Sequence, residues 1–332
     1  MRHNIYFIGG NFLESLRNLL KVVRNILIDY FTWLLFIGIY VIIGFFVPTL
    51  FTARTFQNVV VQGTTVCLLA FGMTFSMLVG KIDLSIVAVA ACAPMVGILL
   101  WERGVPVLIA ILIVLLIGVI IGAINGLMIT KLKIPAIVQT VAMWWMLSGI
   151  VLIVTRGEAK TGLPKLWMLL GKVFIGPFPL IVPFFIIVII VTLIFVRRTV
   201  TGRRLYLVGG NPEACGAMGI SVDRINIVAY IISGFFAALA GYILSARMGF
   251  VSARFAVEWL MPAIAAPVIA GVSLTGGRGN FINVVAGAYL VQLIVIIVRA
   301  GGVGGYATEF VQGVLVFVAI LINAARRRFA GR

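Results

Sequence analysis

The sequence predicts an all-α integral membrane protein with about ten transmembrane helices and both termini in the cytoplasm. Of its 332 residues, 63% are hydrophobic and only 11% are charged, whereas soluble domains carry roughly 45 to 50% apolar and about 25% charged residues. The mean hydropathy is +1.22. A helix needs about 20 apolar residues to cross a bilayer, and such stretches follow one another along most of the chain.

Ten apolar stretches are the expected spans, and charged or Gly- and Pro-containing loops separate them. They cover residues 31–49, 59–79, 84–101, 105–130, 134–154, 176–196, 225–245, 258–275, 280–300 and 307–325. The chain therefore divides into an amphipathic cytoplasmic segment at 1–30, a transmembrane domain at 31–325 and a basic cytoplasmic tail at 326–332.

The orientation follows from the Lys and Arg residues, which favour cytoplasmic loops. With the N-terminus inside, 17 of the 26 Lys and Arg residues fall on the cytoplasmic side. An even number of spans then returns the C-terminus to that side. The N-terminal segment has no compact apolar core followed by a cleavage site, so we expect it to be retained.

Two loops are long. The inner one, 197–224, is basic, and we expect a turn at Gly209 to Pro212, then a short helix from Glu213 to Met218 that ends at Gly219. In the outer one, 155–178, the stretch from Leu163 to Lys172 is predicted to be an amphipathic segment that lies on the outer surface.

Several function classes are disfavoured. The formal net charge of +17 reflects loop cations that set orientation, so we expect no nucleic-acid partner. The only histidine is His3, and we find no catalytic constellation, metal cluster or cofactor site. Gly80-Lys81 and Gly171-Lys172 lack the Ser or Thr and the upstream glycine of a phosphate loop. The chain is not expected to be an enzyme, and any driving ATP is expected to bind another chain.

Ionisable residues deep in a membrane usually mark ion-coupled pathways. The acids nearest the bilayer, Asp83, Glu258 and Glu309, all fall at span ends, which disfavours an ion-coupled carrier. Neutral polar residues do lie within spans. Asn125 and Gln139, together with Trp144, could contact a hydroxylated, uncharged solute. The alternative is that the polar residues hold neighbouring helices together.

Two local patterns predict structure. Gly118, Gly122 and Gly126 recur at four-residue steps, which predicts close packing of that helix against another. Between Gly80 and Ser85 the apolar run stops and restarts, so Asp83 is expected to cap the start of the next helix.

A series of motifs over residues 54 to 325 resembles the ribose-type (carbohydrate) permeases of ABC transporters. Gly72-Met73-Thr74-Phe75 precedes Gly80-Lys81-Ile82-Asp83-Leu84-Ser85, a run similar to that family's GGIDLSVG signature. The other matching runs are Gly122 to Gly126, Ile134 to Thr140, Thr201 to Tyr206 with Gly209-Gly210-Asn211, and Ser273 to Gly279, including Gly276, Gly277 and Gly279. Lys81, Ile86-Val87 and Gln139 depart from the family pattern.

The resemblance implies a permease of the type II importer fold in the bacterial cytoplasmic (inner) membrane, working as a homodimer or heterodimer surrounded by lipid. Its other implied partners are a tandem ATP-binding protein inside and a periplasmic or lipid-anchored solute-binding protein outside. Residues 211 to 219 would form the helix that couples the permease to the ATPase. The residues assigned to it are Asn211, Glu213, Ala214, Cys215, Gly216, Met218 and Gly219.

The expected function is therefore import of a small sugar or sugar-like solute, with ATP hydrolysed by the partner. Permeases for nucleosides and branched-chain amino acids share the broader fold, and an ion-coupled secondary carrier or a membrane scaffold remains an alternative. Outer cations between residues 155 and 178, together with Arg254, could dock an acidic face of the solute-binding protein. Simple solvation of these charges is the alternative.

Overall fold

The computed structural model describes residues 30–176, 178–300, 308–314, 316–318 and 321. Six of its helices are long and apolar enough to cross a membrane, and each coincides with one of the ten expected spans. Shorter apolar helices, Phe31–Phe46, Ile86–Glu102, Val257–Ile269 and Thr308–Val318, lie where the other four spans are expected. The predicted segments 1–30, except Tyr30, and 326–332 lie outside the described residues.

The described part of the chain is mostly helical. The α-helices are α2 (Phe31–Phe46), α3 (Ala53–Leu78), α4 (Ile86–Glu102), α5 (Val107–Lys131), α6 (Ala136–Thr155), α7 (Leu169–Lys172), α8 (Ile181–Arg198), α9 (Val200–Gly210), α10 (Pro212–Ala217), α11 (Val222–Met248), α12 (Leu260–Ile269) and α13 (Phe281–Ala300). Single 3-10 turns are η1 (Pro48–Phe51) and η2 (Val257–Trp259). Two antiparallel pairs join β1 (Lys160–Thr161) to β4 (Phe250–Val251) and β2 (Phe174–Ile175) to β3 (Phe178–Pro179).

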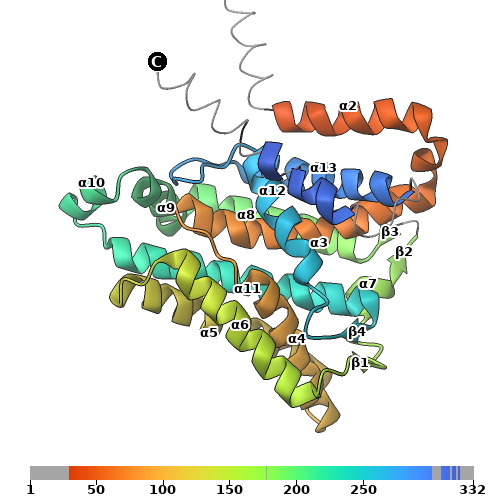
Figure 1. The fold of residues 1–332 in the computed structure, drawn as a ribbon, viewed down its shortest axis with the longest axis horizontal. Coiled ribbons are helices and arrows are strands. Elements are labelled where there is room, and N and C mark those ends of the chain that lie inside the picture. Colours follow the sequence, from red (N-terminus) through yellow and green to blue (C-terminus); the bar gives the residue numbers. More distant parts are fainter. Residues whose placement is uncertain (1–29, 177, 301–307, 315, 319–320, 322–332) are drawn as a thin grey trace, which may run out of the picture.

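The long helices form a bundle that runs from α9 and α10 at one end to the short strands at the other (Figure 1). Helices α3 and α11 lie in its middle and are mostly buried, whereas α5, α6 and α8 expose most of their apolar surface. An apolar surface that no other helix covers suits lipid or a second membrane chain. Helix α2 lies along one edge of the bundle (Figure 1).

Aromatic side chains join α3 to α11 and α13. The ring centroid of Phe281 lies 4.7 Å from that of Phe75 and 5.3 Å from that of Phe71. Phe236 of α11 stacks on Phe75 at 5.8 Å. Pairs at these separations add about 0.5–1.5 kcal/mol each beyond their area burial, so this cluster fixes the three helices against one another.

The glycine face of α5 packs directly on α11, as the four-residue spacing predicts. A Cβ atom at Gly118 would meet the carbonyl oxygen of Gly234, and one at Gly122 would meet that of Tyr230. A Cβ at Gly234 would in turn meet the carbonyl oxygen of Gly118. The two backbones are therefore in contact along this face, because α5 carries no side chain at these positions.

Contacts between loops show which loops lie together at each end of the bundle. At the strand end, named for the short strands, Lys160 Nζ lies 2.9 Å from Glu102 Oε2, and β1 pairs with β4. At the α10 end, Lys131 Nζ lies 2.9 Å from Asp223 Oδ2. The loops joined by these contacts therefore alternate between the two ends along the chain.

The stretch from Leu163 to Lys172 buries one face and exposes the other, as an amphipathic surface segment does. Leu163 and Trp167 are buried, and Trp167 Nε1 donates to Ser245 Oγ at 2.9 Å. The exposed residues are Lys165, Leu166, Leu169 and Lys172. Only Leu169–Lys172 is helical there. In the other loop the expected turn at Gly209 and Gly210 is the end of helix α9, and the break is confined to Asn211.

Candidate functional site

A buried polar network lies between α3 and α4 and involves Asp83, which is only 1% exposed. Its Oδ1 accepts from the backbone nitrogen of Ser85 at 3.1 Å and from Ser85 Oγ at 2.6 Å. Its Oδ2 accepts from Ser233 Oγ of α11 at 2.8 Å. Three donors therefore satisfy the carboxylate, as burial of this group requires.

The network continues outward through two of the residues singled out in the sequence. Asn125 Nδ2 of α5 donates to Ser85 Oγ at 2.9 Å, and Gln139 Nε2 of α6 donates to Asn125 Oδ1 at 3.2 Å. Asn125 is completely buried, whereas Gln139 is half-buried. Every side-chain donor in this series points toward the Asp83 carboxylate, so α4, α5, α6 and α11 share one hydrogen-bonded chain.

Trp144 is not part of this network. It is half-buried on α6 and stacks on the exposed Trp145, with ring centroids 6.3 Å apart and planes 15° apart. Five residues separate Trp144 from Gln139, so they project from different faces of a helix with 3.6 residues per turn. The structure brings Asn125 and Gln139 together and leaves Trp144 apart from both.

Asp83 lies just before α4, as predicted, but it holds the residue that precedes the helix. Its Oδ1 accepts from the backbone nitrogen of Ser85, and Ser85 itself makes no side-chain cap to the helix. This hydrogen bond therefore stabilises the loop that leads into α4. The remaining oxygen reaches across to α11, which the sequence did not indicate.

The segment 211–219 forms the short helix α10 at one extreme of the bundle (Figure 1). Asn211 caps it by accepting from the nitrogen of Ala214 at 2.9 Å, and Pro212 occupies its first turn. Gly219 follows the helix with φ of +77°, a conformation that favours glycine. Local sequence alone accounts for where this helix begins and ends.

Most of the residues assigned to this segment are exposed. Cys215 is the exception, because only 2% of its surface is accessible and it packs into the hydrophobic core. The thiol of Cys215 is therefore not exposed at the surface. Its side chain anchors α10 to the bundle while the rest of the helix projects. The exposed members are Asn211, Glu213, Ala214, Gly216, Met218 and Gly219.

Two glycine-containing turns and the glycine-containing end of α9 meet at the α10 end. The nitrogen of Gly277 donates to the carbonyl oxygen of Leu78 at 2.9 Å, and a Cβ at Gly209 would meet the same oxygen. Gly80 and Gly276 both adopt positive φ, +72° and +90°, and lie against each other. Only glycine permits this backbone contact.

Gly279 and Lys81 also belong to these turns. The carbonyl oxygen of Gly279 accepts from the hydroxyl of Tyr206 at 3.0 Å, which ties α9 to the loop before α13. Lys81 is half-buried beside Gly80. Burial lowers the pKa of its ammonium from the ordinary value, while the nearby Asp223 carboxylate opposes that shift.

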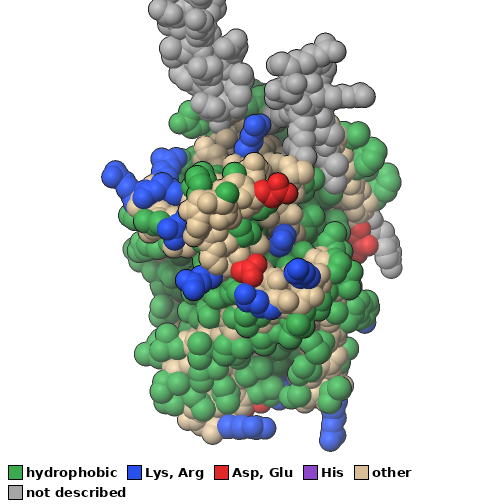
Figure 2. All heavy atoms as spheres, turned by 90° about the vertical axis from the view of Figure 1, so that its left-hand side faces the viewer, with side chains coloured by type: hydrophobic (Ala, Val, Ile, Leu, Met, Phe, Trp, Pro, Cys, Tyr) green, Lys and Arg blue, Asp and Glu red, His purple; other side chains and the backbone are tan. Residues whose placement is uncertain are grey.

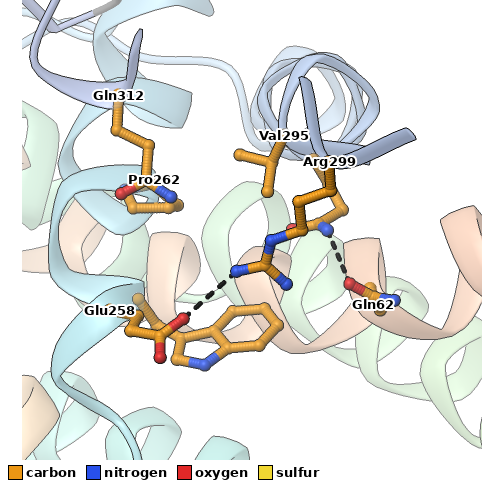
Figure 3. Close-up of a pocket in the computed structure, with 8 residues that line it drawn as sticks. Gln62, Glu258, Pro262, Val295, Arg299 and Gln312 are labelled. Atoms are coloured by element: carbon orange, nitrogen blue, oxygen red, sulfur yellow. Dashed lines mark hydrogen bonds and ion pairs between the residues drawn. The ribbon is translucent and has the colours of Figure 1, made fainter. Parts of the chain in front are cut away.

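A second polar cluster lies toward the strand end, between α3, α13 and η2 (Figure 3). Gln292 Nε2 donates to Gln62 Oε1 at 2.7 Å, and Arg299 Nη2 pairs with Glu258 Oε2 at 3.2 Å. The cavity among these side chains is about 10 Å³, about the space of a single water molecule. These groups are therefore packed against one another and hold no solute-sized space.

Sequence reasoning missed Ser233 and the role of Gly209. Ser233 begins a run of small residues on α11 that includes Gly234, Ala237 and Gly241, and such a run indicates a close helix contact without naming a carboxylate partner. Gly209 was assigned to a turn, whereas its lack of a side chain serves the contact with Leu78. Among the residues that the structure describes, no group of three His, Cys, Asp or Glu could hold a metal ion.

Comparison with known proteins identifies the architecture. Residues 55–320 match the family model described as the permease component of the branched-chain amino acid transport system. The chain belongs to this permease family. The membrane-crossing helices are thus those of an importer subunit, and the expected membership in the ABC importer permeases is confirmed.

Curated relatives of the permease cover nearly its whole length. It is 32% identical over 293 residues to the ribose import permease protein RbsC of Bacillus subtilis, which covers 87% of this chain and 91% of that protein. It is 31% identical over 295 residues to the autoinducer 2 import system permease protein LsrC of Yersinia enterocolitica, with 89% and 81% covered. The Escherichia coli K12 LsrC is 32% identical over 299 residues, with 88% and 85% covered.

No solved structure matched the permease. Its relatives are transport subunits rather than enzymes. Together with the apolar helices, they make this chain a multi-pass protein of the bacterial inner membrane and the permease subunit of an ABC importer.

Proposed function

We propose that the permease carries a small sugar or sugar-like solute into the cytoplasm, and that a separate ATPase supplies the energy through α10. The observation that carries the coupling role is the geometry of α10. It is a short, capped helix held to the bundle by the buried Cys215, with its other assigned residues exposed. A projecting helix with a buried anchor can transmit a push from a partner to the bundle.

The solute class rests on the relatives' names and on the polar network. The relatives import ribose and autoinducer 2 by name. In this chain, Gln139 is the half-buried end of a series of uncharged donors that runs to Asp83. Amide and hydroxyl groups suit the hydroxyl groups of a sugar. Asn125 and Gln139 are proposed to lie on the solute path, with Trp144 and Trp145 forming a separate aromatic surface on α6.

The proposed topology has ten spans and places the α10 end, with both termini, in the cytoplasm. The described part of the chain has as many Lys and Arg residues at the strand end as at the α10 end. The bias that sets orientation therefore comes from the cations of segments 1–30 and 326–332. Figure 2 views the bundle from the α10 end, where several Lys and Arg side chains and fewer acidic ones lie at the surface.

The proposed assembly contains two permease chains, identical or not, a tandem ATP-binding protein at α10 and a solute-binding protein at the strand end. The exposed apolar faces of α5, α6 and α8 leave room for a second permease and for lipid. On the strand end, Arg156 and Arg254 are exposed, while Lys160 pairs with Glu102. The first two are therefore the stronger candidates for docking an acidic partner.

Isothermal titration calorimetry tests whether nucleotide binds elsewhere. The purified permease in detergent should release no heat of binding with ATP and magnesium, since the sequence holds no phosphate loop. The complex isolated from the same cells should bind and hydrolyse ATP. Binding of ATP by the isolated permease at micromolar concentration would remove the need for a partner and would contradict the proposal.

A further inference from the structure

A cleft of about 420 Å³ opens at the α10 end, between the end of α9 and the turn that precedes α13. It is separate from the polar network and from the exposed face of α10. Its lining residues are Gly209, Gly210, Ser273, Thr275, Gly276, Gly277 and Arg278. More than half of these are glycines, so much of the wall is bare backbone and the space is not filled by the chain's own side chains.

The polar groups of the cleft suit an anion. Arg278 is exposed, and among the described residues it takes part in no ion pair. Ser273 Oγ and Thr275 Oγ1 lie 3.0 Å from each other on the same turn. A guanidinium and hydroxyl groups that line one cleft can together bind a carboxylate or a phosphate.

The described part of the permease supplies no acid for this cleft. The acids at this end that reach solvent are Glu213, on the projecting α10, and the partly exposed Asp223, which pairs with Lys131 at 2.9 Å. The exposed cations of this end are more numerous and include Arg197, Arg203, Arg204 and Arg224. A partner that covers this face therefore gains most by presenting negative charge.

We propose that the cleft seats an acidic side chain of the partner ATPase, as a docking contact distinct from α10. This inference rests on the proposed function, because it assumes that the ATPase covers the α10 end. The carboxylate binds the Arg278 guanidinium and the hydroxyl groups of Ser273 and Thr275. The glycine walls let the partner's backbone approach closely.

The cleft is joined to the inner end of α3 by backbone contacts. Its wall residue Gly277 donates to the carbonyl oxygen of Leu78, and Gly209 packs on the same oxygen. The loop that follows Leu78 carries Asp83 and Ser85, which belong to the polar network. Movement of an acid seated in the cleft is thus passed to the loop that holds the network together.

Gly210 offers a steric test that spares the fold. It is the last residue of α9 and lines the cleft, and a Cβ there would meet no atom within 4 Å. A side chain at this position therefore starts in open space, and Gly210→Phe is expected to occupy the cleft. Gly149 on α6 also has open space around its Cβ, so Gly149→Phe is the matched control at a site away from the cleft.

The experiment measures the affinity of the ATPase purified from the native complex for permease variants in nanodiscs of phosphatidylcholine, by biolayer interferometry. Arg278→Glu tests the charge and Gly210→Phe the space, with Arg204→Glu as the charge control on the same face. Each test variant should bind more weakly, with a dissociation constant raised about tenfold or more. Each control should change it by less than about threefold. If the acidic residue of the ATPase that occupies the cleft is replaced by Arg, binding to the Arg278→Glu permease should be restored.

The inference is overturned if Arg278→Glu binds no more weakly than Arg204→Glu, or if Gly210→Phe binds like Gly149→Phe. A loss that appears only in nanodiscs containing phosphatidylglycerol assigns the cleft to a lipid phosphate and also overturns it. Failure of the unaltered permease to bind any ATPase contradicts the proposed function itself, which is a different result. A melting temperature equal to that of the unaltered permease confirms that each variant is folded.

Discussion

The hydroxyl of Ser233 donates to Oδ2 of Asp83 at 2.8 Å, although 150 residues separate them in the chain. The carboxylate thereby links α11, in the middle of the bundle, to the turn between α3 and α4. Because the same carboxylate also receives Ser85, the position of this turn depends on α11. The hydrogen bond from Ser233 thus holds the turn between α3 and α4 against α11, and it gives the buried Asp83 carboxylate its third donor.

Ser233→Ala should destabilise the permease by about 1–3 kcal/mol, because it leaves a buried carboxylate oxygen without its donor. Thermal unfolding in detergent measures the effect. Thr192→Val is the control, since the buried Thr192 hydroxyl donates only to Val188 of its own helix at 2.7 Å. Equal melting temperatures for Ser233→Ala and Thr192→Val would show that the bond to Asp83 contributes nothing.

Gln139→Ala distinguishes a solute contact from a contact that only joins helices. Gln139 donates to the buried Asn125, so its loss should lower the melting temperature somewhat, while solute uptake per folded protein should fall several-fold. Ser148→Ala, on the same helix and also half-buried, should alter neither. If uptake per folded Gln139→Ala protein equals that of the unaltered permease, the residue serves only helix packing and the proposed solute path is wrong at this position.

Gly122→Ala should destabilise the bundle, because its Cβ would meet the carbonyl oxygen of Tyr230 on α11. Overpacking of this kind costs about 1–3 kcal/mol. Gly149→Ala has open space and should be neutral or stabilising by up to about 1 kcal/mol, since Ala favours helix over Gly. Melting temperatures in detergent compare the two. A lower melting temperature for Gly149→Ala than for Gly122→Ala would contradict the observed packing.

Met218→Cys tests the orientation of the α10 end. Met218 is 65% exposed, whereas Cys67, Cys92 and Cys215 are buried, so the unaltered folded protein should resist a membrane-impermeant maleimide. The variant should be labelled in inverted vesicles and protected when the ATPase is bound. Labelling of Met218→Cys in intact right-side-out vesicles would reverse the proposed topology.

Arg156→Glu combined with Arg254→Glu should weaken the stimulation of ATP hydrolysis by the solute-binding protein, most strongly at low salt. Arg54→Glu, an exposed cation expected at the same end, is the control. Hydrolysis by the reconstituted complex is measured over a titration of the binding protein. Unchanged half-maximal concentrations would mean that these charges are only solvated.

The helices were largely predictable from the sequence, because long apolar stretches and charged loops report directly on membrane crossing. The close packing of α5 was also predictable, from the spacing of Gly118, Gly122 and Gly126. The hydrogen-bond partners of the polar residues were not predictable from the sequence. Nothing near Asp83 in the chain points to Ser233, since that contact depends on how α11 lies in the folded bundle.

Local composition did not reveal which loop side chains are buried. In residues 163–172, Trp167 is buried because its ring packs beside Tyr242, with centroids 5.3 Å apart, and its nitrogen donates to Ser245. Cys215 lies in a polar loop, yet it is the buried anchor of α10. In both cases the tertiary partner comes from α11 or the surrounding core, which sequence spacing does not reveal. The functional roles of the site residues remain predictions.

The central claim is that an ATPase bound at α10 drives this permease, and uptake into proteoliposomes tests it most directly. The permease is reconstituted with the ATPase and the solute-binding protein of its native complex, using the solute that the binding protein carries. Uptake should require ATP on the side of α10, persist with a protonophore present, and be lost in Gly219→Val, whose φ of +77° disfavours a side chain. Uptake by the permease alone, without ATP and abolished by the protonophore, would contradict the account.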